Sequence, residues 1–100
     1  MDQETIDKLK VEHGELHIIE ADGHTVAVRM PTAAEFERFV ETAQKKELAA
    51  MKRFLRDCLV YPSQDELTAM IAKRPGIFVP FAKELAKISG ATVEAEGKKA

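Results

Sequence analysis

Prolines and helix-capping residues divide this chain into short segments, and this feature constrains the fold more than any other. Two capping-box patterns, a hydroxyl residue followed three positions later by glutamate, each mark the first turn of a helix: Thr32 with Glu35, and Ser63 with Glu66. Helix-ending residues follow at Pro62, Pro75-Gly76 and Gly90. Most of the chain is therefore expected to form a series of short helices.

Apolar residues recur at helical spacing between Thr32 and Pro62. This stripe contains Phe36, Phe39, Val40, Ala43, Leu48, Met51, Leu55, Cys58 and Leu59. It fits either one continuous helix or two helices joined near residues 44–46. Acidic residues come first and basic residues later, and because this order complements a helix dipole, it favours the continuous helix.

Two more helices are predicted after Pro62. The first follows Ser63, carries Leu67, Met70 and Ile71, and stops before Pro75-Gly76. The second begins near Ile77 or Phe78, because Pro80 is tolerated only in the first turn of a helix. Gly90 is placed to cap its C-terminus.

Alternating apolar residues between Glu15 and Met30 predict a β-hairpin around Ala21-Asp22-Gly23. A three-residue loop would pair Ile18 with Val26 and Leu16 with Val28, and this is the register we expect. A two-residue Asp22-Gly23 turn would instead pair Ile19 with Val26 and send Leu16 and Ile18 to the opposite face.

Length and composition favour one small domain, and the predicted elements make it α+β and mostly helical, with the N-terminal hairpin followed by three to four amphipathic helices. The chain has 100 residues, of which 45% are hydrophobic and 32% charged, as expected for a globular protein. We expect an N-terminal segment (1–14), one domain (15–90) and a flexible tail (91–100). The sequence shows neither a signal peptide nor a membrane-spanning stretch, so a cytoplasmic location is expected.

The polar residues do not form a recognisable catalytic or metal-binding pattern. His13 and His17 are four apart, but a zinc site needs further ligands and His17 falls on a predicted strand. Cys58 is the single cysteine and lies on the apolar stripe, which favours a core role. Asp65 and Glu66 suit the first turn of a helix. We expect no enzymatic activity, no metal and no cofactor.

The residues from Lys45 to Arg56 form the densest basic segment and could contact nucleic acid phosphates. A net charge of -2 and the dipole argument both favour a solvated helix instead. A helix-turn-helix around Pro75-Gly76 is disfavoured, because the second helix begins with apolar residues where base-reading side chains should lie.

The five phenylalanines exceed what the core of so small a domain requires, so one or two are expected at a partner surface. Candidate partner contacts are the apolar residues at helical spacing on the two longest stripes: Met51, Phe54, Leu55, Phe78 and Phe81. A homo-oligomer is equally compatible with such a surface.

Short motifs in this order resemble the small tail assembly chaperones of long-tailed bacteriophages and prophages. They are Arg29-Met30-Pro31-Thr32 after the hairpin, Cys58-Leu59-Val60-Tyr61-Pro62-Ser63, Arg74-Pro75-Gly76 and Ile88-Ser89-Gly90. The resemblance covers residues 16–90, although Pro80 departs from the uninterrupted final helix expected of that family.

The resemblance implies a non-enzymatic, helical protein that binds the tape measure protein, helps recruit tail tube subunits and is absent from the mature virion. It also implies that a longer form can arise by ribosomal frameshifting near Lys98-Lys99. Two alternatives remain: a small nucleic-acid-binding regulator that uses the Lys45–Arg56 segment, and a structural component of the virion.

Overall fold

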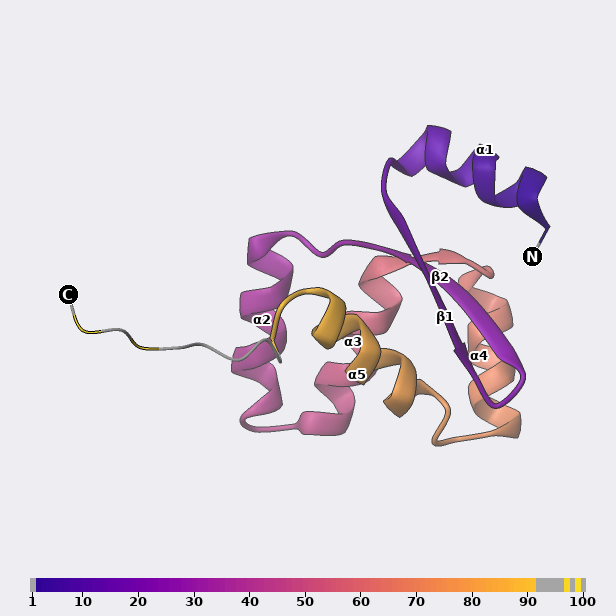
Figure 1. Ribbon diagram of the computed structural model, residues 1–100. Helices are drawn as coiled ribbons and strands as arrows, with labels where there is room; N and C mark the ends of the chain where they lie inside the picture. The colour runs from indigo at the N-terminus through magenta and orange to yellow at the C-terminus, as the bar shows by residue number, and fades with distance from the viewer. Residues whose placement is uncertain (1, 92–96, 98, 100) are drawn as a thin grey trace.

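The chain folds as an α+β protein in which helices predominate, as predicted. The computed structural model describes residues 2–91 together with 97 and 99. Within them, five helices and one three-stranded antiparallel sheet are present (Figure 1). In chain order they are α1 (Gln3–His13), β1 (Leu16–Ala21), β2 (His24–Arg29), α2 (Ala33–Ala43), α3 (Glu47–Cys58), β3 (Leu59–Tyr61), α4 (Gln64–Lys73) and α5 (Phe78–Ile88).

The hairpin exists, but the expected register is wrong by one residue on β1. Ile19, not Ile18, pairs with Val26, and Leu16 pairs with Arg29. Asp22 and Gly23 both have positive φ angles, 50° and 78°, which is the two-residue turn whose twist matches a hairpin. This turn places Ile19 on the buried face and leaves Ile18 41% exposed. The alternative register considered from the sequence is the observed one.

The long apolar stripe forms two helices, so the continuous helix favoured by the charge order is wrong. The chain leaves helical geometry at Lys46, where φ is −141° and ψ is 81°. This break lets α2 fold back along α3 (Figure 1), and Phe36 and Phe39 of α2 contact Phe54 of α3. A continuous helix would have left the phenylalanines of α2 without this partner surface.

The capping predictions are confirmed at the starts of α2 and α4 and at the end of α5. The Thr32 hydroxyl accepts from the Glu35 N–H at 3.2 Å, and the Ser63 hydroxyl accepts from the Glu66 N–H at 3.1 Å. At the end of α5, Gly90 has a φ of 96°, and the N–H of Ala91 donates to the Ala86 carbonyl. This is the Schellman arrangement, which satisfies carbonyls that the helix end leaves open.

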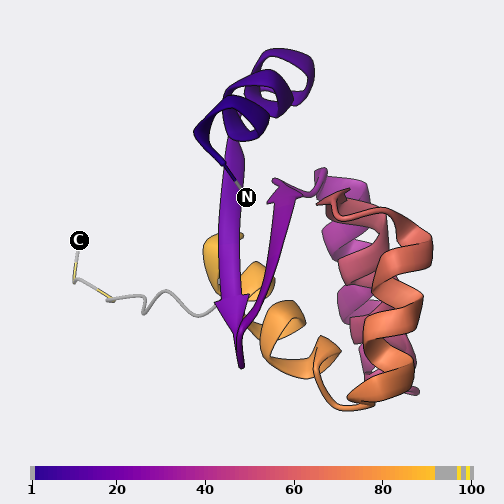
Figure 2. The ribbon, with the colours of Figure 1, turned by 90° about the vertical axis from the view of Figure 1, so that its right-hand side faces the viewer.

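Two elements were not predicted, α1 and β3. The Asp2 carboxylate caps α1 by accepting from the Thr5 N–H at 2.7 Å, and α1 lies beyond the start of β1, away from the other helices (Figure 2). The apolar positions of α1 are too few for a clear stripe.

The short strand β3 pairs with β2 through Ala27 opposite Tyr61 and Val28 opposite Leu59. Sequence reasoning had assigned Leu59 to the preceding helix.

One core joins the inner face of the hairpin to α3, α4 and α5. Its largest fully buried side chains are Phe54, Phe81, Leu55, Leu67, Leu85, Val26, Val28 and Cys58. Among the described residues, none of the helices is long and apolar enough to cross a membrane. The predicted flexible tail at 91–100 lies outside the described residues, except for 91, 97 and 99.

Candidate functional site: an apolar groove between α2, α3 and α5

Three helices form an open apolar groove. α2 and α5 both pack against α3, and α3 forms the floor between them. The groove has a volume of about 390 Å³, and its lining is Phe39, Val40, Ala43, Gln44, Glu47, Met51, Ala82, Lys83 and Ala86. Small alanine side chains on both walls leave room for larger apolar side chains from another molecule.

Aromatic contacts set the position of the α2 wall. Phe39 stacks on Phe54 of α3 with ring centroids 4.3 Å apart and an interplanar angle of 8°. Phe36 meets Phe54 edge to face at 6.0 Å. Such aromatic pairs contribute about 0.5–1.5 kcal/mol each beyond area burial. No residue of α2 is fully buried, so these contacts hold a helix that is otherwise at the surface.

A charged clamp fixes the start of α2. Both terminal guanidinium nitrogens of Arg29 donate to Glu35, Nη1 to Oε1 and Nη2 to Oε2, each at 2.8 Å. Arg29 Nη2 also donates to the Asp57 carbonyl at 2.7 Å, so one guanidinium connects the end of β2 to α2 and α3. Glu35 Oε1 accepts from the Thr32 N–H as well, completing the capping box.

The clamp changes the acidity of its carboxylate. Because Arg29 and the Thr32 N–H stabilise the ionised form, the pKa of Glu35 falls from 4.5 to about 2. Glu35 therefore remains charged at any pH at which the protein is expected to work. It serves here as a structural anion and not as a proton donor.

The five residues predicted as partner contacts lie in the core of this structure. Relative exposure is 5% for Met51, 2% for Phe54, 0% for Leu55, 6% for Phe78 and 0% for Phe81. We therefore assign them to the interior, where they belong to the single hydrophobic core cluster. Of the five, Met51 alone lines the groove, as part of its floor.

The exposed apolar residues are different ones. The larger ones include Val40 at 41% on the groove wall and Leu48 at 61% near the start of α3. Val40 was visible in the sequence as part of the apolar stripe. The exposure of Val40 could not be predicted from the sequence, because it depends on how far α5 lies from α2.

Charged residues flank the groove with opposite signs. On α2, Glu37 and Glu41 are exposed and lie on the side that carries Val40 and Gln44. On α5, Lys83 and Lys87 are exposed, one turn apart, on the side that carries Ala82 and Ala86. The outer edge of the α2 wall is therefore acidic, and the outer edge of the α5 wall is basic.

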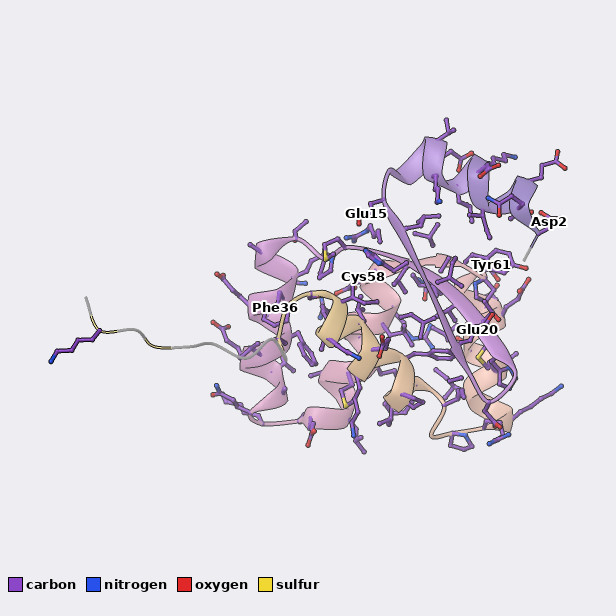
Figure 3. All side chains as sticks on the ribbon, viewed as in Figure 1. Asp2, Glu15, Glu20, Phe36, Cys58 and Tyr61 are labelled. Carbon is purple, nitrogen blue, oxygen red and sulfur yellow. The ribbon has the colours of Figure 1, made fainter. Side chains whose placement is uncertain are left out.

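The nucleophile and metal candidates occupy positions that suit structural roles. Cys58 is fully buried at the end of α3 near the centre of the molecule (Figure 3), and burial raises the pKa of its thiol to about 11. His17 Nε2 is buried without a hydrogen-bond partner among the described residues, and Glu15 Oε1 lies 3.5 Å from it. In the described part of the chain, no cluster of three metal-ligating side chains occurs. The side chain of His13 lies outside the described residues.

Lys52, Arg53 and Arg56 lie on the face of α3 that points away from the core, and each contacts another group of the protein. Lys52 lies over the ring of Phe78 on α5, 5.0 Å from its centroid. Arg56 donates to Gln64 and Thr68 of α4, while Arg53 pairs with Asp57 at 3.7 Å. Each of the three side chains is therefore engaged in a contact within the protein, although their spacing keeps them on one face of α3.

Sequence comparison identifies the family. The family described as "Domain of unknown function (DUF6848)" matches residues 9–98, and the chain belongs to it. Its fold is similar to the structure of uncharacterised protein rbstp2171 from Bacillus stearothermophilus, with a TM-score of 0.83 and 26% sequence identity. That similarity covers 93% of this chain and 99% of the other. No curated protein matches the chain significantly.

Proposed function

We propose that this protein is a non-enzymatic tail assembly chaperone of a bacteriophage or prophage. It acts in the cytoplasm of the bacterial host, binds helical segments of the tape measure protein, helps recruit tail tube subunits and leaves before the virion matures. The observation that carries the proposal is the apolar groove between α2, α3 and α5. The resemblance of the turn motifs to that chaperone family supports the same conclusion.

The groove suits a helix better than a small molecule. Small-molecule sites are usually clefts or cavities that bury most of the ligand surface in a mostly apolar lining with a few polar groups. The groove has such a lining, with Gln44, Glu47 and Lys83 as its polar residues, but it is open to solvent on one side and would leave much of a small ligand exposed. An amphipathic helix that lays its apolar face into such a groove would bury the exposed side chain of Val40.

Coexpression with the tape measure protein of the same phage or prophage genome tests the proposal. The tape measure protein should aggregate when it is expressed alone and should be recovered soluble, in complex, when this chain is present. Val40→Glu should abolish recovery, because it places a charge on the groove wall. Leu48→Glu is the matched control: Leu48 is also exposed and on a helix but does not line the groove.

Folding of each variant is checked by circular dichroism. If Val40→Glu unfolds the protein, Ala86→Gln tests the opposite wall in the same way. Equal recovery with wild type and with a folded groove variant would overturn the proposed function. So would detection of the protein at stoichiometric level in purified virions, which would make it a structural component.

A further inference from the structure

We infer that the groove selects partner helices by charge: it takes an amphipathic helix whose apolar stripe has basic residues along one flank and acidic residues along the other. This inference rests on the proposed function, since it describes the partner at the same groove. It adds a recognition rule that depends on residues outside the apolar lining.

The two walls of the groove, α2 and α5, carry charged residues along their outer edges. Met51, Val40 and Ala86 line the groove, and helix periodicity places the outer edges of α2 and α5 beside the flanks of a helix bound between Val40 and Ala86. The α2 edge carries Glu37 and Glu41, and the α5 edge carries Lys83 and Lys87.

Walls of opposite charge disfavour a helix whose two flanks carry the same charge. A helix with lysines on both flanks would meet Lys83 and Lys87 on one side, and a helix with glutamates on both flanks would meet Glu37 and Glu41 on the other. Like-charge contacts disfavour wrong partners, while exposed opposite charges add only modestly to affinity. The walls therefore act mainly by rejecting helices with flanks of a single sign.

The opposite charges of the walls also favour one direction of the bound helix along the groove. A helix with mixed flanks meets both walls favourably in one of its two directions along the groove, and reversing the helix exchanges its flanks. In the other direction both flanks meet like charges. The charge pattern thus gives the bound helix a preferred direction, which an apolar groove alone would not provide.

Three labelled synthetic peptides with the same leucine stripe test this inference by fluorescence anisotropy. One has lysines on one flank and glutamates on the other, the second has lysines on both flanks, and the third has glutamates on both flanks. The mixed peptide should bind wild type about three- to tenfold more tightly than either of the others at low salt. The preference should shrink as salt rises, because the edge charges are exposed.

Charge-reversed variants should change the ranking in a defined way. The double variant Lys83→Glu with Lys87→Glu makes both walls acidic and should favour the all-lysine peptide. The matched control is Lys8→Glu with Lys10→Glu on α1, which changes the net charge equally at two exposed lysines away from the groove. The control should keep the wild-type ranking.

Equal binding of the three peptides by wild type, or an unchanged ranking in the groove variant, would overturn the inference. So would no binding at all, or a second copy of this chain filling the groove, which analytical ultracentrifugation of wild type and Val40→Glu detects. The two proposals fail separately. If Val40→Glu abolishes tape measure recovery but the reversals change nothing, only the charge rule fails; if the peptides rank as expected but recovery ignores Val40→Glu, only the proposed function fails.

Discussion

Replacing Glu35 by glutamine should loosen the α2 wall of the groove without changing its shape. The substitution keeps the size of the side chain but removes the charge that Arg29 binds through two hydrogen bonds of 2.8 Å. Since no residue of α2 is fully buried, the clamp and the phenylalanine contacts are the main interactions that hold this helix.

The magnitude follows from the pKa of Glu35. Lowering this pKa from 4.5 to about 2 corresponds to an upper limit of roughly 3 kcal/mol of folding free energy. The side chains of Arg29 and Glu35 are 33% and 19% exposed, so solvent screens part of the interaction. We therefore expect Glu35→Gln to lower the free energy of unfolding at pH 7 by about 1–2 kcal/mol.

The effect should depend on pH in one direction only. The folded-state pKa of Glu35 is depressed, so its contribution is fully present above about 4.5 and is lost as the pH falls towards about 2. The difference between wild type and Glu35→Gln should be constant from pH 7 to pH 6. By pH 3 about half of it or more should have disappeared.

Urea unfolding followed by circular dichroism at pH 7, 6, 4 and 3 measures this difference. Glu37→Gln is the matched control, because Glu37 is an exposed glutamate two positions further along α2. The control should change stability by less than about 0.5 kcal/mol at pH 7. A Glu35→Gln effect that is absent at pH 7, or equally large at pH 3, would refute the reasoning.

Three further predictions test the core and the turns. Phe54→Ala should lower the free energy of unfolding by about 3–5 kcal/mol, because Phe54 is a core residue that stacks on Phe39. Phe54→Leu should lower it clearly less. A neutral effect of Phe54→Ala in urea unfolding would instead indicate a surface role. Gly23→Ala should cost about 1–2 kcal/mol from its positive φ alone, while Gly76→Ala, with open space and no positive φ, should be near neutral in the same assay. The thiol of Cys58 should react with a disulfide reagent at pH 8 at least about a hundredfold more slowly in the native protein than in denaturant; equal rates would contradict its burial and its pKa of about 11.

Local signals in the sequence determined where most elements begin and end. The capping residues Thr32 and Ser63, the turn at Pro75-Gly76 and the cap at Gly90 all work through atoms within a few residues of each other, so they could be recognised without the fold. The core role of Cys58 was also predictable, because its place on the apolar stripe reflects the helix that carries it.

Tertiary packing decided the rest, because it depends on which distant segments meet. The turn at Asp22-Gly23 allowed two registers, and burial of Ile19 against the helices accompanies the observed one. The break at Lys46 and the fold-back of α2 turned Phe54 from a possible surface residue into the centre of an aromatic cluster. The groove and its oppositely charged edges exist because α2 and α5 both pack on α3 but leave Val40 open to solvent, an arrangement that no spacing within one helix could reveal.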